Sequence, residues 1–211
     1  MWIGDSDIPA DAVRAFYEHM ASRFGASVQP KAASGTMQAA AAFLALLGIQ
    51  SREQFMSDYV TTMGRTVFVP YEIGSVGAWS PWQQIATMAH ECQHIVQSDT
   101  TGLVKHALDY AAPAGRTRLE CEAYTTSMEL HHWHYGSIEG WWMHETARGM
   151  RHYGVGEIDQ AAMRRHLMAA APIVRRGGFV TTAATVAIEW LDTHLPEARA
   201  MGVASRARGA A

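Results

Sequence analysis

The spacing of apolar residues predicts a chain made mostly of helices. Apolar side chains recur every three to four residues over most of the sequence, as on the buried face of a helix. Several of these stretches are followed by a glycine that would end the helix, such as Gly25 and Gly136. The predicted helices cover residues 8–24, 36–48, 51–64, 80–97, 103–111, 116–134, 138–153, 159–171 and 181–194.

One segment differs from the rest in residue composition, and this composition predicts a strand. Residues Thr66-Val67-Phe68-Val69-Pro70-Tyr71-Glu72-Ile73 are rich in β-branched and aromatic side chains. Pro70 has no backbone N–H, which favours an edge strand, to which an extended peptide could add as a further strand. A short packing strand explains the segment equally well. Residues 27–35 are predicted as loop, and the fold class is α+β, predominantly helical, with a small sheet.

The helix predicted at 80–97 has the clearest chemical pattern. Ser80 with Gln83 three residues later forms a capping box, and Pro81 falls at the first helical position. Further along is the sequence His90-Glu91-Cys92-Gln93-His94. At about 100° per residue, His90 and His94 point the same way, and Gln97 shares their stripe. The opposite side is apolar, and Cys92 is expected to face the core.

Two histidines one helical turn apart can bind one Zn²⁺, and the adjacent Glu91 can act as general base toward a zinc-bound water. A helix that merely carries two surface histidines is the alternative. A catalytic zinc needs a third protein ligand. Gln97 and Thr100 stand where the metzincin pattern needs glycine and histidine, so that class is excluded. The remaining candidates are Asp99, His106, Asp109, Glu120, Glu122 and the His131–His134 cluster, for which a solvated helix end is the favoured interpretation.

Composition limits the other possibilities. The chain has 211 residues, a hydrophobic fraction of 48% and a net charge of −3, as in an ordinary globular protein. Its two lysines, Lys31 and Lys105, form no basic face for nucleic acid. The longest apolar run, residues 39–49, is too short to span a membrane, and no signal peptide is visible. Two cysteines make no disulfide framework. We therefore expect a soluble, cytoplasmic protein.

Two segments of the chain resemble motifs of a known enzyme group. His90-Glu91-Cys92-Gln93-His94, followed by Glu120-Cys121-Glu122-Ala123-Tyr124, is similar to the gluzincin arrangement of zinc metallopeptidases, which includes the thermolysin-like enzymes. In that group the third ligand is a glutamate on a second helix, often followed by alanine. The small members, called minigluzincins, also carry an edge strand before the zinc helix. The similarity covers roughly residues 64–125.

The resemblance implies His90, His94 and Glu122 as zinc ligands and Glu91 as general base. Glu120 is the rival third ligand, because residues two apart on a helix point about 200° apart and only one can face the metal. An oxyanion-stabilising side chain is also expected, and spacing does not choose among its candidates. These are Tyr71, Tyr124, His144, His152 and Tyr153.

The chain is expected to form one domain, 1–211. Within it, 1–63 would be a helical N-terminal part, 64–135 a zincin-like core, 136–195 C-terminal helices and 196–211 a flexible tail. The expected function is zinc-dependent hydrolysis of peptide bonds in a peptide or protein substrate, without nucleic-acid or membrane partners. The alternative is a zinc-bearing binding or regulatory module with little turnover, with Trp133, Trp141 and Trp142 as a partner surface.

Overall fold

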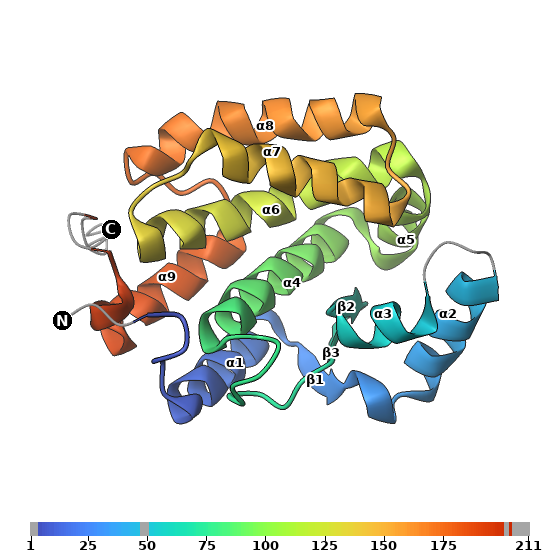
Figure 1. Cartoon of the computed structure of the whole chain (residues 1–211), viewed down its shortest axis with the longest axis horizontal. Coiled ribbons are helices and arrows are strands. Elements are labelled where there is room, and N and C mark those ends of the chain that lie inside the picture. Colours follow the sequence, from blue (N-terminus) through green and yellow to red (C-terminus); the bar gives the residue numbers. More distant parts are fainter. Residues whose placement is uncertain (1–3, 47–50, 201–202, 204–211) are drawn as a thin grey trace.

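The computed structural model describes residues 4–46, 51–200 and 203, and within them the chain is mostly helical with a small sheet (Figure 1). Each predicted helical segment contains a helix. The predicted end of the second helix at Gly48 and residues 201–202 and 204–211 of the predicted tail lie outside the described residues. The α-helices are α1 Ala10–Phe24, α2 Gly35–Leu46, α3 Arg52–Ser57, α4 Pro81–Thr101, α5 Leu103–Ala111, α6 Pro113–Tyr135, α7 Gly140–Gly149, α8 Glu157–Arg175 and α9 Thr182–His194.

The sheet has three strands, β1 Ser27–Pro30, β2 Thr61–Met63 and β3 Thr66–Val69, in the order β1-β3-β2. β3 pairs in parallel with β1 and antiparallel with β2. The predicted strand is thus confirmed over Thr66–Val69, but its prediction as an edge strand is wrong. Pro70 follows the last paired residue and does not interrupt the ladder. The third predicted helix, expected over 51–64, ends at Ser57, and β2 occupies Thr61–Met63.

The central position of β3 fits its burial on both faces. Val67 and Val69 belong to a first core that also includes residues of α1, α4 and α9. Phe68 points to the other side, where it packs with Met37 and Phe55 of α2 and α3. An uninterrupted apolar run is typical of a strand covered on both faces.

α4 runs through the centre of the molecule, with α6, α7 and α8 on one side and α1 and the sheet on the other (Figure 1). Its apolar stripe, with Ile85, Met88 and Cys92, belongs to the first core, so the predicted burial of Cys92 is confirmed. A second core joins α6 to α7 and α8. α6 contributes to both cores and lies beside α4, and this packing determines which of its side chains face the histidines.

The C-terminal end of α6 differs from the expected solvated helix end. His132 and His134 are buried, and the two ring nitrogens of His134 lie 2.6 Å from the Ala198 carbonyl oxygen and 3.0 Å from a carboxylate oxygen of Asp5. These contacts connect α6 to segments near both ends of the chain. In the described part of the chain, no helix combines the length and apolarity needed to cross a bilayer.

Candidate metal centre

Local sequence signals establish α4. Ser80 accepts a hydrogen bond from the Gln83 backbone, the Gln83 side chain accepts one from the Ser80 backbone, and Pro81 is the first helical residue. The helix runs on to Thr101, past the predicted end. His90 and His94 are one turn apart on the side that faces α6.

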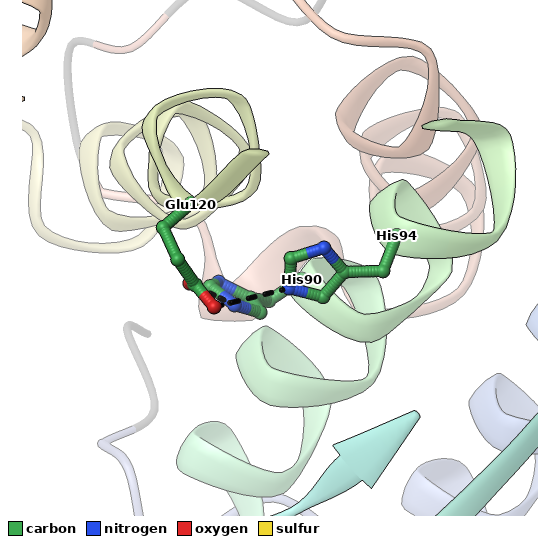
Figure 2. A group of neighbouring side chains, drawn as sticks. All are labelled: His90, His94 and Glu120. Carbon is green, nitrogen blue, oxygen red and sulfur yellow. Dashed lines mark ion pairs between the residues drawn. The ribbon is translucent and has the colours of Figure 1, made fainter. Parts of the chain in front are cut away.

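The two imidazoles meet a carboxylate from α6. His90 Nε2 lies 3.4 Å from Glu120 Oε2, and His94 Nε2 lies 3.6 Å from Glu120 Oε1 (Figure 2). One nitrogen or oxygen atom from each residue falls within 4.8 Å of the other two. All three residues are buried. Two histidines and one carboxylate are a frequent ligand set for catalytic zinc, so the donors fit the metal predicted from the sequence.

The structure brings Glu120, and not Glu122, to the two histidines. Glu122, favoured from the resemblance, does not join the group; its side chain is exposed, and its carboxylate accepts a hydrogen bond from Gln97 Nε2 at 3.0 Å. Glu120, the rival, is 3% exposed. The reason is geometric, because α6 turns the Glu120 side toward α4 and residue 122 is about 200° further around the helix.

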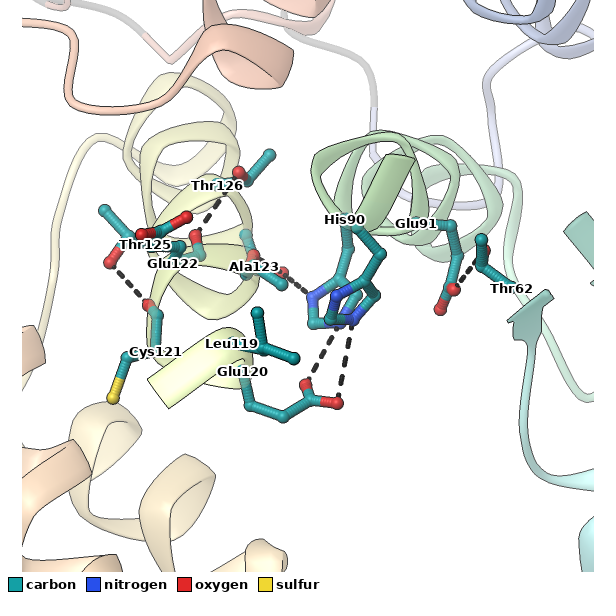
Figure 3. Close-up of polar contacts among 12 residues, drawn as sticks. Thr62, His90, Glu91, Leu119, Glu120, Cys121, Glu122, Ala123, Thr125 and Thr126 are labelled. Atoms are coloured by element: carbon teal, nitrogen blue, oxygen red, sulfur yellow. Dashed lines mark hydrogen bonds and ion pairs between the residues drawn. The ribbon is translucent and has the colours of Figure 1, made fainter. Parts of the chain in front are cut away.

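Outer hydrogen bonds orient both rings. His94 Nδ1 lies 2.9 Å from Gln97 Oε1, while Gln97 Nε2 donates to the Leu119 carbonyl at 2.8 Å. Since the amide oxygen can only accept, His94 Nδ1 donates this hydrogen bond, and Nε2 is the ring nitrogen that faces Glu120. His90 Nδ1 lies 3.1 Å from Ser127 Oγ, and the His90 ring also bonds the Ala123 backbone (Figure 3). Such outer partners are typical of metal-binding histidines.

The electrostatics of the group favour an ionised carboxylate. Burial alone would raise the pKa of Glu120, but the charges of His94 and His90 and hydrogen bonds from His90 and Tyr110 lower that pKa to about 2. Tyr110 Oη donates to Glu120 Oε1 at 2.9 Å. Burial lowers the pKa of His90, but Glu120 and Glu91 outweigh it, so the net shift of that pKa is upward. A buried anion beside two imidazoles is a strong attractor for a cation.

Glu91 lies beside the group without joining it. Its side chain is 7% exposed, and Thr62 Oγ1 of β2 donates to Glu91 Oε2 at 2.6 Å (Figure 3). Glu91 and His90 both line a cavity of about 360 Å³. The other lining residues are Asp58, Tyr59, Val60, Trp79, Ala86, Thr87, Tyr124, Ser127, Gly149, His152 and Tyr153. His90 of the pair thus lines the same cavity as the predicted base.

The structure separates the oxyanion candidates. Tyr124, His152 and Tyr153 line the cavity, and the Tyr124 ring meets the His90 ring edge-on with centroids 4.7 Å apart. Burial raises the pKa of Tyr124, so its phenol stays protonated at neutral pH and can donate a hydrogen bond. Tyr71 instead bonds Tyr17 at 2.7 Å, and His144 is exposed; neither of them lines this cavity.

Sequence reasoning missed four partners of the site. Gln97 shares the stripe of the histidines, and its position three residues after His94, within reach on a helix, is the sequence signal that points to this contact. Ser127, Tyr110 and Thr62 carry no sequence signal, because they come from other elements.

No protein-family model, curated protein or solved structure matches this chain.

Proposed function

We propose that this chain is a zinc-dependent metallopeptidase with a zincin-like core, formed by the sheet, α4 and α6. The observation that carries the proposal is the convergence of His90 Nε2, His94 Nε2 and the Glu120 carboxylate beside a cavity lined by Glu91. His90, His94 and Glu120 would hold the zinc. Three protein ligands leave a coordination position for water or substrate, as in hydrolytic zinc sites.

When bound, zinc would supply Lewis-acid chemistry, lowering the pKa of a coordinated water and polarising a carbonyl group. The chain's own residues do the rest. Glu91 takes the proton from the attacking water and passes it to the leaving amine. The Thr62 hydroxyl holds Glu91 Oε2, which leaves Glu91 Oε1 for that proton. Tyr124, beside His90, is the side chain best placed to donate to the developing oxyanion.

The strand expected to align the substrate is also reassigned. β3 is covered on both sides by β1 and β2, so its backbone has no open edge. β2 is the outer strand on the side of α4, and the segment that leads into it, residues 58–60, lines the cavity. A peptide in the cavity would therefore lie next to β2.

The test compares the wild type with Glu91→Gln. Purified wild-type protein is expected to contain about one zinc per chain and to cleave a quenched fluorescent peptide library, and both properties should vanish on chelation and return with added zinc. Because Glu91 is a base and not a ligand, Glu91→Gln should keep the zinc and lose about 10²- to 10⁴-fold in rate.

A matched control is Glu72→Gln, an exposed glutamate that does not line this cavity. It should leave both zinc content and cleavage unchanged. Cleavage by the wild type that survives complete chelation, or protein that binds no zinc at any pH near neutrality, would end the proposal.

A further inference from the structure

Lys31 is a wholly buried lysine, one of two lysines in the chain. It follows the last residue of β1 directly and starts a short 3-10 helix, Lys31–Ala33. Its Nζ donates to the Phe55 carbonyl at 2.6 Å, to the Tyr59 carbonyl at 2.9 Å and to Thr61 Oγ1 at 3.0 Å. Buried lysines are uncommon unless they are paired, so this one calls for an explanation.

The three acceptors match the ammonium group. An ammonium has three N–H donors and no acceptor, and each donor here has one oxygen. The Phe55 carbonyl belongs to the last turn of α3, where carbonyls lack a partner within the helix and favour a cation. The ammonium also lies 3.7 Å from the centre of the Phe55 ring.

The segment that Lys31 holds leads directly to the candidate active site. Asp58, Tyr59 and Val60 line the cavity, between the Phe55 and Thr61 contacts of Lys31. The next residue along β2, Thr62, donates to Glu91. The contacts thus run from the buried ammonium through one short segment to the predicted general base.

We propose that Lys31 is a positioning residue whose ammonium fixes residues 55–61 and, through Thr62, the carboxylate of Glu91. The role of Glu91 as a base rests on the proposed function. Charge and hydrogen bonding matter here, and packing alone does not suffice: a neutral side chain of the same length would leave two carbonyls and a hydroxyl without their buried partner. The cavity wall would then shift, and small displacements of catalytic groups have large effects on rate.

The test is Lys31→Met, which keeps most of the length of the side chain and removes its charge. We expect kcat to fall about 10- to 100-fold with KM changed less, because the base is misplaced while the ligands on α4 and α6 stay in position. Zinc affinity should stay within about threefold of the wild type, since Lys31 contacts none of the metal-binding residues. Amide hydrogen exchange should become faster at residues 58–63 and stay unchanged in the middle of α4.

Met37→Ala is the matched control. Met37 is also fully buried and packs in the small cluster with Phe55, so its truncation weakens the same part of the fold without removing the cation. The two variants are compared at temperatures where equal fractions are folded. An equal loss of kcat in both would reduce Lys31 to a packing residue and overturn the proposal.

A double-mutant cycle with Thr62→Val tests the path to Glu91. If Lys31 acts through Thr62, Lys31→Met should cost much less in the Thr62→Val background than in the wild type. Additive effects would overturn the proposal. A wild type without turnover would instead overturn the proposed function, and with it the catalytic meaning of the Thr62–Glu91 contact. Unchanged amide hydrogen exchange at residues 58–63 in Lys31→Met would refute the positioning role itself.

Discussion

α4 and α6 together supply the three converging side chains, yet the two helices are built in different ways. α4 begins with a side-chain capping box, and its apolar stripe packs into the first core. α6 begins after Ala112 without a side-chain cap, and it contributes Leu130 and Trp133 to the first core and Cys121 and Met128 to the second.

This difference decides what can be read from each helix. α4 is also packed on several sides, but the spacing of four residues makes His90 and His94 point the same way wherever the helix packs. α6 is covered on several sides, so its buried polar residues are not confined to one stripe. Glu120, Thr125, Glu129 and His134 are all buried on it. The direction of its glutamates is therefore set by packing against α4, α5 and α8, which no local pattern reports.

The largest effect should come from the choice between the two glutamates of α6. Glu120→Gln removes the buried anion that lies between His90 and His94, and we expect zinc affinity to fall by at least about 100-fold. Glu122→Gln should change it by less than about threefold, because that carboxylate is exposed and outside the group. Competition titration with a chromogenic chelator measures both variants, and the reverse order of effects would restore Glu122 as the third ligand.

The second effect concerns the hydrogen bond that orients His94. Gln97→Leu removes the amide oxygen that holds His94 Nδ1 and leaves the Leu119 carbonyl without its donor. Loss of such an outer partner typically costs about 10- to 100-fold in metal affinity. Gln97→Glu offers an acceptor to the same nitrogen and should recover part of the affinity in the same titration. If Gln97→Leu binds zinc like the wild type, the ring is held by packing alone.

Much of the site was predictable because its chemistry is local in the sequence. The helix caps, the spacing of His90 and His94 and the adjacent Glu91 all lie within one segment, and the structure has them on one helix. The helices on either side were equally visible from their apolar spacing. What could not be read depends on contacts between distant segments, such as Thr62 with Glu91 and Tyr110 with Glu120.

The sheet shows the same limit. β1 and β2 have few apolar residues, Ser-Val-Gln-Pro and Thr-Thr-Met, and neither stands out from the surrounding sequence. Each is held by pairing with β3, and without these partners β3 looks like an edge strand that ends at a proline. The continuous apolar run of β3 was the available hint that it is covered on both faces.

A third effect follows from the ionisation of the group in chelated protein. The pKa of His90 is raised, so its contribution to stability is complete below about pH 6.5 and is lost as pH rises through the raised pKa. The pKa of Glu120 is lowered to about 2, so its contribution is present above the ordinary value of 4.5 and is lost as pH falls toward 2. Burial lowers the pKa values of His19, His106 and His131, which acts in the opposite direction. The His90 contribution is therefore the stability difference between chelated wild type and chelated His90→Gln, and this difference should be larger at pH 6 than at pH 8.

Zinc should reverse this pH dependence, because it competes with protons for the imidazoles and stabilises more at pH 8 than at pH 6. Scanning calorimetry with and without zinc measures both trends. His90→Gln supplies the reference for chelated protein. A stability difference between chelated wild type and chelated His90→Gln that does not shrink from pH 6 to pH 8 would show that the His90–Glu120 contact does not contribute in this range.

The smallest effect tests whether the local signals of α4 shape the site or only the helix. Ser80→Ala removes the hydroxyl that accepts from the Gln83 backbone, and we expect a loss of about 1 kcal/mol in the free energy of unfolding, measured by urea denaturation. Zinc affinity should stay unchanged, because the cap lies about three turns before His90 and contacts none of the three converging residues. Ser80→Asp, which can still cap, should keep the stability. If Ser80→Ala weakened zinc binding as much as Gln97→Leu does, the helix start and the metal centre would form one cooperative unit, and the contrast between a locally specified α4 and a packing-specified α6 would no longer hold.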